Sequence, residues 1–288
     1  MKISKDTVFL IVGLGLMGGS YARALTKNGY TVNAITLEQS SIDYALENKI
    51  INKGSVTPDP ELIGSADIVI FALYPHVFTE WIGNNQHLLK SGVIITDVTG
   101  VKSGIVEDIQ SALREDAEFI AAHPMAGREV YGVQNSDDAI FKNANYIVVP
   151  TEKNTKTAVD ICREIGVILG FSQISELSPA KHDEMIAFLS QLTHCIAICL
   201  MTCNRDENLA YYTGDSFRDL TRIANINENM WSELFLLNKE KLIEMMKIFR
   251  NDFDKLMGYI ENNDEQNIKE MMRVSTKRRK LFNKKETQ

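Results

Sequence analysis

The chain of 288 residues has no excess of positive charge. It holds 31 lysines and arginines against 38 aspartates and glutamates, which gives a formal net charge of −7. A protein that binds nucleic acid needs a basic face, because binding displaces counterions from the phosphates. The charge balance therefore argues against a nucleic-acid partner and favours a small-molecule ligand.

The chain is also poor in cysteine, and its N-terminal apolar stretch is short. The apolar stretch near the N-terminus, VFLIVGLGLMGG, is interrupted by glycines, is too short to span a membrane and has no small-residue cleavage site after it. The chain contains four cysteines, which agrees with a reducing compartment. We therefore expect a cytoplasmic protein without a membrane partner.

Three of the cysteines, Cys195, Cys199 and Cys203, recur at every fourth residue and share one stripe of a predicted helix. Such a stripe could bind a metal. The flanking residues are apolar, however, and no second cluster of ligand residues lies nearby in the sequence. We therefore expect small, buried packing residues and no metal.

The spacing of apolar residues changes once along the chain, and no repeat or low-complexity linker marks the change. Up to about residue 176, short β-branched runs alternate with amphipathic helical stretches. This alternation predicts an α/β, Rossmann-like domain: a doubly wound, mostly parallel sheet with both faces covered by helices. The predicted strands are 7–13, 31–36, 67–73, 93–97, 118–122, 146–150 and 171–177.

After residue 177 the apolar residues follow helical spacing only. Ser178 and Pro179 predict an N-cap and a first helical position, for a helix that runs to about residue 204. Ser216 with Asp219 resembles a capping box, and further helices are predicted over 228–259 and 265–282. We therefore expect two domains, residues 1–175 and an all-α domain over 176–288, whose basic tail is a solvated helix end.

The glycine-rich stretch GLGLMG (residues 13–18) follows the first predicted strand and opens the first helix. In that context the G-x-G-x-x-G pattern predicts a dinucleotide site. Gly13 permits the tight turn, Gly15 lets the backbone approach a pyrophosphate, and Gly18 allows close packing of helix on strand. The helix start, at Leu16 and Met17, supplies N–H donors to the phosphates.

The end of the second predicted strand is where NAD-selective proteins usually carry an acidic residue that binds the ribose 2′-hydroxyl. Here that place falls at Thr36, with Glu38 two residues on, and no arginine follows that would attract a 2′-phosphate. We therefore expect NAD as the cofactor, with Thr36 and Glu38 near the ribose, and NADP remains an alternative.

A second motif, FIAAHPMAGRE (residues 119–129), places His123 at the end of a predicted strand. The proline stiffens the turn, and the glycine gives the backbone freedom. In doubly wound folds, ligands bind at the carboxyl ends of the strands, so His123 is at a catalytic location.

The stretch HPMAGRE resembles the motif that carries the catalytic histidine of the prephenate dehydrogenase family. GLGLMGGS, DVTGVK, HDEMIAFLSQLTH, FRDLTRIA and MW followed by Asn238 resemble further segments of that family in the same order, over most of the chain. The resemblance implies oxidative decarboxylation of prephenate to 4-hydroxyphenylpyruvate, or of its amino analogue arogenate, in tyrosine biosynthesis. It also implies an interlocked homodimer.

The resemblance assigns roles to individual residues. His123 accepts a hydrogen bond from the ring hydroxyl of the substrate while hydride leaves the same carbon, because a neutral imidazole can take a proton near neutral pH. Arg222 pairs with a substrate carboxylate through two parallel N–H bonds. His194 binds substrate, and Ser190 shares its helical stripe.

Two residues beside these are assigned less sharply. Arg218, one helical turn before Arg222, is either a second substrate contact or an exposed ion pair. His182 is expected to be an orienting or structural partner.

One departure from the family pattern lies in DVTGVK. Many members have D-V-G-S-V-K, with a serine that hydrogen-bonds the catalytic histidine and the substrate hydroxyl. Gly100 stands at the place of that serine, so either Thr99, through a shifted loop, or a water is expected to replace it. Thr99 is therefore the second candidate catalytic residue.

Two interpretations compete with this one. A β-hydroxyacid dehydrogenase shares the glycine motif and the helical second half, and would use Lys181, but HPMAGRE has no role in that chemistry. A non-catalytic dinucleotide sensor is disfavoured by His123 and Arg222. Since the chain ends soon after its last predicted helix, we expect a monofunctional enzyme without a fused regulatory or mutase domain.

Overall fold

The computed structural model describes residues 2–282, and the chain forms two compact units, Met1–Lys239 and Glu240–Gln288. The change from strands to helices near residue 176 lies inside the first unit. The domain boundary expected at that change stays a prediction.

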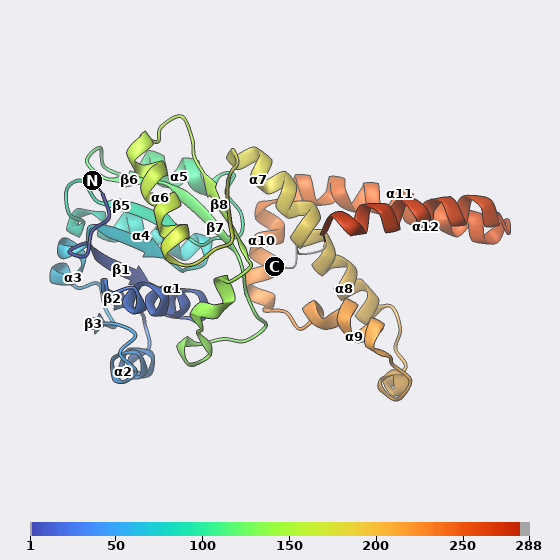
Figure 1. The fold of residues 1–288 in the computed structure, drawn as a ribbon, viewed down its shortest axis with the longest axis horizontal. Coiled ribbons are helices and arrows are strands. Elements are labelled where there is room, and N and C mark those ends of the chain that lie inside the picture. The colour runs from blue at the N-terminus through green and yellow to red at the C-terminus, as the bar shows by residue number, and fades with distance from the viewer. Residues whose placement is uncertain (1, 283–288) are drawn as a thin grey trace. The chain divides into compact units, whose positions relative to one another are not determined.

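A six-stranded, wholly parallel sheet forms the centre of the first unit, in the order β3-β2-β1-β4-β5-β6 (Figure 1). The chain moves outward in one direction from β1 and then in the other, which is the Rossmann arrangement and confirms the predicted fold class. The strands are β1 (Val8–Val12), β2 (Thr31–Ile35), β3 (Lys53–Ser55), β4 (Ile68–Phe71), β5 (Ile94–Asp97) and β6 (Glu118–Phe119).

A second sheet of three strands follows: β7 (Ala121–Met125), β8 (Asn145–Val149) and β9 (Gln173–Glu176). Strand β7 runs antiparallel to β8, and β8 parallel to β9. The predicted strand 118–122 is divided between the two sheets, because β6 ends at Phe119 and β7 continues to Met125. His123 therefore lies in the middle of β7, opposite Ile147, and not at a strand end as predicted. Pro124 is tolerated there because β7 is an edge strand of its sheet.

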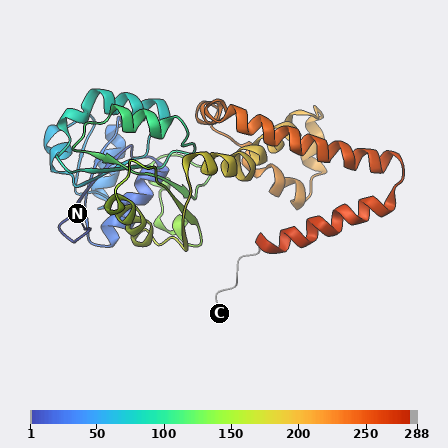
Figure 2. The same ribbon diagram turned by 90° about the horizontal axis from the view of Figure 1, so that it is seen from above.

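Helices cover both faces of the large sheet, as predicted (Figures 1 and 2). Alternate side chains of β1 point to opposite faces: Phe9 and Ile11 belong to one buried cluster, and Leu10 and Val12 to the other. The first cluster is covered by α1 (Leu16–Lys27), α2 (Gln39–Glu47) and α6 (Lys156–Ile168), and the second by α3 (Pro60–Ser65), α4 (Pro75–Asn85) and α5 (Ile105–Ala112).

The helical part begins as predicted, since the side chain of Ser178 caps α7 by accepting the N–H of Lys181. The helices are α7 (Pro179–Ile186), α8 (Leu192–Thr202), α9 (Asp215–Thr221), α10 (Glu228–Leu237), α11 (Lys239–Glu261) and α12 (Glu265–Arg279), with a π-helical turn at Ala187–Gln191. Short 3-10 turns lie at Gln86–Leu88, Val133–Asn135, Asp138–Phe141, Glu207–Tyr211, Arg222–Ala224 and Lys280–Phe282.

Two helix predictions are wrong. Ser216 lies inside α9, because Gly214, in extended conformation, takes the N-cap position. The predicted helix 228–259 is divided at Asn238 into α10 and α11. Of the basic tail, residues 283–285 lie outside the described residues.

The segment Pro179–Thr202 is long and apolar enough to cross a membrane by length and composition, with a mean hydropathy of 1.7. Core helices of soluble proteins pass the same test. Here the polar side chains His182, Asp183 and Gln191 are buried and hydrogen-bonded to neighbouring elements. These contacts fit a helix packed against protein.

The cysteine stripe on this helix differs from expectation. Cys199 and Cys203 are exposed, so the prediction of buried packing residues is wrong for these two. Cys195 is partly exposed. The physical reason is that this face of α8 is uncovered in the single chain. Within residues 2–282, no group of three or more histidines, cysteines and carboxylates could hold a metal.

Candidate active site

The glycine-rich turn between β1 and α1 has the geometry that its sequence predicts. Gly13 has a φ of +97°, and a Cβ there would lie 2.4 Å from the carbonyl oxygen of Ala72. A Cβ on Gly18 would lie 1.9 Å from the carbonyl oxygen of Gly13. Both positions therefore require glycine for the fold itself.

Gly15 is different, because a Cβ there would meet nothing within 4 Å in the described part of the chain. Its backbone faces open space at the start of α1. The helix begins at Leu16 and Met17, both partly exposed, and the N–H groups of a first helical turn lack partners within their helix. The turn thus offers a cradle in which a pyrophosphate fits.

The end of β2 lies beside this turn, since the N–H of Gly13 donates to the carbonyl oxygen of Ile35 at 2.8 Å. Thr36 follows directly and donates its own N–H to Ser55. Glu38 precedes α2 on the surface, and its carboxylate accepts a hydrogen bond from Ser41 Oγ at 3.2 Å. Thr36 and Glu38 therefore lie at the same carboxyl end of the sheet as the glycine turn, which is where the ribose is expected from the sequence.

A buried ion pair lies at the end of β5. The side chain of Lys102 is fully buried, and its Nζ lies 2.5 Å from Asp97 Oδ2, 2.6 Å from the carbonyl oxygen of Ala122 and 3.0 Å from Thr99 Oγ1. Burial lowers the pKa of Lys102, although the charge of Asp97 acts in the opposite direction. The pair joins β5 to β7 one residue before His123. The sequence pattern did not predict this pair, although its two charged residues flank the run VTGV.

Thr99 is not brought to His123. Its hydroxyl contacts the carboxylate of Asp97 and lies 3.1 Å from the carbonyl oxygen of Val101. The same oxygen accepts a hydrogen bond from the ammonium of Lys102. A hydroxyl has a single proton to donate, so this side chain is satisfied within its own loop. The expectation that Thr99 supplies the missing serine hydroxyl therefore finds no support in its contacts.

Gly100, at the place of that serine, faces an apolar neighbour. A Cβ there would lie 3.3 Å from Cδ1 of Leu234 on α10. The side chain of Leu234 is buried and belongs to the core cluster on the α4 and α5 side of the sheet. The absent hydroxyl thus coincides with hydrophobic packing of the helical part against the β5 loop.

His123 belongs to a line of three polar groups. Its Nδ1 lies 2.9 Å from Nε2 of His182, and Nδ1 of His182 lies 2.7 Å from Oδ1 of Asp183. His182 and Asp183 are fully buried, whereas His123 is partly exposed. Burial is the main cause that holds the pKa of His123 well below its ordinary value of 6.5; repulsion from His182 whenever that ring is protonated, and from the Lys102 ammonium, acts in the same direction. At neutral pH His123 is therefore an uncharged imidazole.

Asp183 is itself held by the loop that carries the ion pair. Its carboxylate accepts the backbone N–H groups of Lys102 at 2.9 Å and Ser103 at 2.6 Å. Asn238, at the break between α10 and α11, donates its side-chain amide to the carbonyl oxygen of Asp183 at 3.0 Å and to Gln191 Oε1 at 2.8 Å. The start of α7 is thus fixed to the nucleotide-binding part through backbone and side-chain bonds.

A second group of polar residues contains the predicted substrate ligands. The guanidinium of Arg222 contacts the carboxylate of Glu129, in the loop that follows β7. His194 stacks on Trp231 with ring centroids 3.6 Å apart, and its Nδ1–H donates to the carbonyl oxygen of Ser190 at 2.9 Å. Burial lowers the pKa of His194. The charge of Glu129 raises this pKa, and the charge of Arg222 lowers it. Arg222, Glu129 and His194 therefore lie close together.

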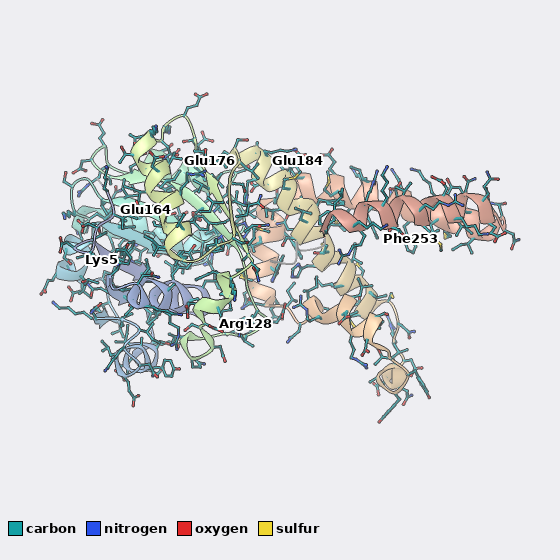
Figure 3. The ribbon with its side chains drawn as sticks, in the orientation of Figure 1. Lys5, Arg128, Glu164, Glu176, Glu184 and Phe253 are labelled. Atoms are coloured by element: carbon teal, nitrogen blue, oxygen red, sulfur yellow. The ribbon has the colours of Figure 1, made fainter. Side chains whose placement is uncertain are left out.

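Arg218 is not brought into this group, since it pairs with Asp215 at 2.5 Å and with the carbonyl oxygen of Thr213 at 3.2 Å on the surface of α9. Lys181, which a β-hydroxyacid dehydrogenase would need, is also exposed and pairs with Glu184 at 2.6 Å. Arg128, in the loop after β7, forms an ion pair with Asp137 at 2.7 Å. Figure 3 labels Arg128.

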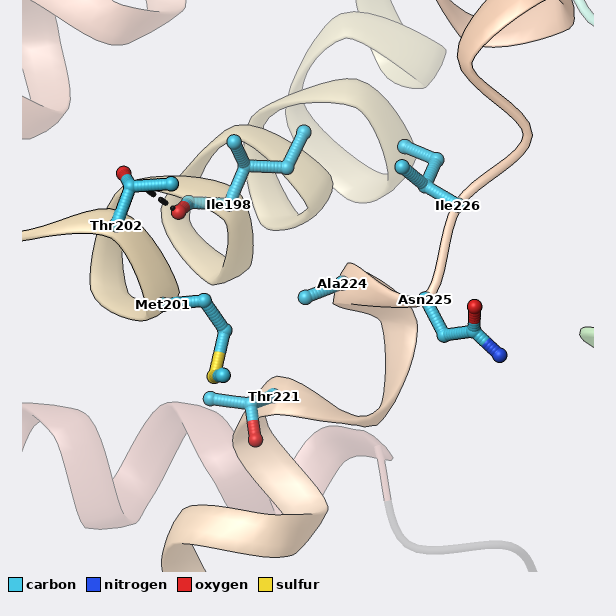
Figure 4. Close-up of a pocket in the computed structure, with 7 residues that line it drawn as sticks. All are labelled: Ile198, Met201, Thr202, Thr221, Ala224, Asn225 and Ile226. Carbon is cyan, nitrogen blue, oxygen red and sulfur yellow. Dashed lines mark hydrogen bonds between the residues drawn. The ribbon is translucent and has the colours of Figure 1, made fainter. Parts of the chain in front are cut away.

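A cavity of about 470 Å³ lies between α8 and the segment that joins α9 to α10 (Figure 4). Its lining is mainly apolar and holds no ionisable side chain among the described residues, so it offers no acid–base chemistry. The lining residues are Ile198, Met201, Thr202, Thr221, Ala224, Asn225 and Ile226.

Comparison with known proteins identifies relatives over nearly the whole chain. Prephenate dehydrogenase of Bacillus subtilis is 30% identical over 281 residues, which cover 93% of this chain and 74% of the relative. Cyclohexadienyl dehydrogenase of Zymomonas mobilis is 28% identical over 281 residues, 93% of this chain and 94% of the relative. The crystal structure of Aquifex aeolicus prephenate dehydrogenase, in complex with hydroxyphenyl propionate and NAD+, superposes with a TM-score of 0.89 at 27% identity, covering 98% of this chain and 100% of that one.

Two family models match in sequence. The nucleotide-binding domain of prephenate dehydrogenase matches residues 21–170, and the dimerization domain of prephenate dehydrogenase matches residues 178–274. The chain therefore belongs to the prephenate dehydrogenase family of NAD(P)-dependent oxidoreductases.

Proposed function

We propose that this protein oxidises and decarboxylates prephenate to 4-hydroxyphenylpyruvate, with NAD as the hydride acceptor. The observation that carries the proposal is the partly exposed His123, whose Nδ1 lies 2.9 Å from Nε2 of the buried His182. Its other ring nitrogen, Nε2, is proposed to face the substrate. The family, and relatives that are named prephenate dehydrogenase, support the reaction class.

His123 acts as the base. Its uncharged ring accepts the proton of the ring hydroxyl as hydride leaves the same carbon, so that a carbonyl forms there. The ring carboxylate then leaves as carbon dioxide, and its bonding electrons move through the ring to the carbonyl oxygen, which takes back the proton held by His123 and becomes the phenol hydroxyl. Aromatisation drives the step forward. Burial lowers the pKa of His123, and the Lys102 ammonium adds to this effect, so that the ring is uncharged before the substrate binds.

Arg222 binds a substrate carboxylate. In the structure its partner is Glu129, so the substrate carboxylate replaces or joins this carboxylate at the guanidinium. The same Glu129 favours arogenate as the second candidate substrate, because an ammonium group beside the substrate carboxylate would find an anionic partner there. Arg218 has other partners, and we leave it outside the proposed site.

NAD is proposed to bind across the glycine turn, with its pyrophosphate at Gly15, Leu16 and Met17 and its adenine ribose near Thr36 and Glu38. When bound, its nicotinamide accepts the hydride. The open space in front of Gly15 fits a pyrophosphate, and the carboxylate of Glu38 fits a ribose hydroxyl better than a 2′-phosphate.

A homodimer is proposed because the helices expose apolar faces. Figure 2 shows α11 and α12 diverging from the turn between them, and Figure 3 shows Phe253 on α11. An exposed apolar stripe follows α11 at helical spacing, and a second copy would bury it. It consists of Ile243, Met246, Phe249, Phe253, Met257 and Ile260. A match to a dimerization domain over residues 178–274 supports the same assembly, which would also cover the exposed cysteine face of α8 and suits a cytoplasmic enzyme.

The purified protein is expected to form reduced cofactor fastest with prephenate and NAD, as followed by absorbance in a matrix of prephenate or arogenate with NAD or NADP. A kcat/KM at least tenfold higher with arogenate would transfer the proposal to the second candidate. Absence of turnover with both substrates would contradict it.

Gly15→Val and Gly18→Ala are expected to separate binding from folding. Gly15 has extended backbone angles that valine adopts, so this variant should melt like the wild type while its KM for NAD rises at least tenfold. Gly18→Ala should lower the melting temperature, because its Cβ would overlap backbone. Equal NAD affinity in Gly15→Val and the wild type would contradict the proposal that the cofactor binds at this turn.

His123→Asn is expected to lower kcat by about 10² to 10⁴, with KM and NAD affinity nearly unchanged, because only the proton-accepting group is lost. In the wild type, kcat should stay level as pH falls through 6.5 and decline only at lower pH, since the base must be uncharged and its pKa is lowered. The variant should lose this acidic limb, whereas the exposed His87→Asn should keep it. A wild-type kcat in His123→Asn would eliminate this residue as the base.

Arg222→Gln is expected to raise the KM for prephenate by roughly 10- to 150-fold with a smaller effect on kcat, because a charge-assisted hydrogen bond contributes about 1.5 to 3 kcal/mol to binding. Arg218→Gln is the matched control on the preceding turn and should change KM less than threefold. If the two variants exchange these effects, the carboxylate ligand has been misassigned.

A further inference from the structure

The three groups Asp183, His182 and His123 come from two elements, α7 and β7, and form a continuous hydrogen-bond line. The two contacts measure 2.7 Å and 2.9 Å between heavy atoms. Each contact can hold one proton, so the direction of donation in the first determines the direction in the second.

Asp183 can only accept in this line. Its two oxygens already receive the backbone N–H groups of Lys102 and Ser103, which have no alternative protonation state. Burial raises the pKa of Asp183, but the hydrogen bonds from His182 and Ser103 outweigh it and keep the carboxyl ionised. His182 must therefore donate its Nδ1–H to Asp183.

The other nitrogen of His182 then carries a lone pair. The ring is fully buried, and burial lowers the pKa of His182 against the opposing effect of Asp183, so the ring is uncharged at neutral pH. Its Nε2 can only accept, and the group that faces it is Nδ1 of His123. His123 must therefore carry its proton on Nδ1.

We propose that His182 and Asp183 are positioning residues that hold His123 in the Nδ1–H tautomer, so that its Nε2 lone pair faces the substrate. This matters because a free imidazole in water favours the proton on Nε2, the tautomer that would donate to the substrate hydroxyl and could not take its proton. After proton transfer, the imidazolium of His123 donates to His182, whose basicity is supported by the carboxylate of Asp183. The inference deepens the proposed function, and only its kinetic test rests on that function.

Nitrogen-15 NMR of the histidine-labelled, full-length protein tests the tautomer without any substrate. The chain has five histidines, so single variants assign the signals. At neutral pH, Nδ1 of His123 should show the shift of a protonated nitrogen and Nε2 that of an unprotonated one. A protonated Nε2 in the wild type overturns the proposal.

His182→Leu and His182→Gln form the kinetic pair. The leucine variant removes the acceptor, so His123 should revert towards the Nε2–H tautomer and kcat should fall ten- to a hundredfold at unchanged KM. The glutamine amide oxygen can accept from Nδ1 of His123, so His182→Gln should recover most of kcat and the Nδ1–H signal. Loss of kcat in both variants, with the wild-type tautomer retained in both, assigns His182 a purely structural role and contradicts the proposal.

Asn238→Leu is the structural control, because it removes a buried hydrogen bond to the backbone of Asp183 without touching the ring protons. It should lower the melting temperature and leave the tautomer of His123 unchanged. A lost Nδ1–H signal in this variant would show that packing of α7, and not the hydrogen-bond line, sets the tautomer. If neither prephenate nor arogenate is turned over, the proposed function fails while the NMR result still decides the tautomer.

Discussion

The buried ion pair of Lys102 and Asp97 is the interaction on which the active-site region depends. Removing both charges from water costs several kcal/mol per ion, which is offset only while each keeps its partners, and loss of one partner costs about 3 to 5 kcal/mol. Lys102 meets this condition with Asp97 at 2.5 Å and the carbonyl oxygen of Ala122 at 2.6 Å. Because Ala122 directly precedes His123, the ion pair determines where the base lies.

The same loop also determines where the helical part begins. The backbone N–H groups of Lys102 and Ser103 bind the carboxylate of Asp183, and Asp183 orients the ring of His182. His123 therefore lies between two elements that are fixed to one loop, β7 on one side and α7 on the other. A change in that loop would displace the base and its supporting histidine together.

The predictions that were confirmed are those that depend on neighbours in sequence. Short β-branched, near-continuous apolar runs predicted the buried strands, and an N-cap serine followed by proline predicted the start of α7. Strand β3 has the sequence KGS, without an apolar pattern, and exists because it lies beside β2 at the sheet edge. The break at Asn238 has no strong local signal either, and coincides with side-chain bonds to Asp183 and Gln191 from another helix.

The sequence by itself determined the Rossmann-like class, the glycine turn and, through its resemblance to a family, the motif residues His123, Arg222 and His194. Gly13 and Gly18 could be predicted locally, because the positive φ of Gly13 and the close approach of Gly18 to the Gly13 backbone both arise within one turn. Only the tertiary structure decided that the Thr99 hydroxyl is used by Asp97 and that His123 meets His182, 59 residues away. Hydrogen-bond partners at such separations are determined by how sheet and helices pack, and packing is the sum of many contacts that no short stretch of sequence contains.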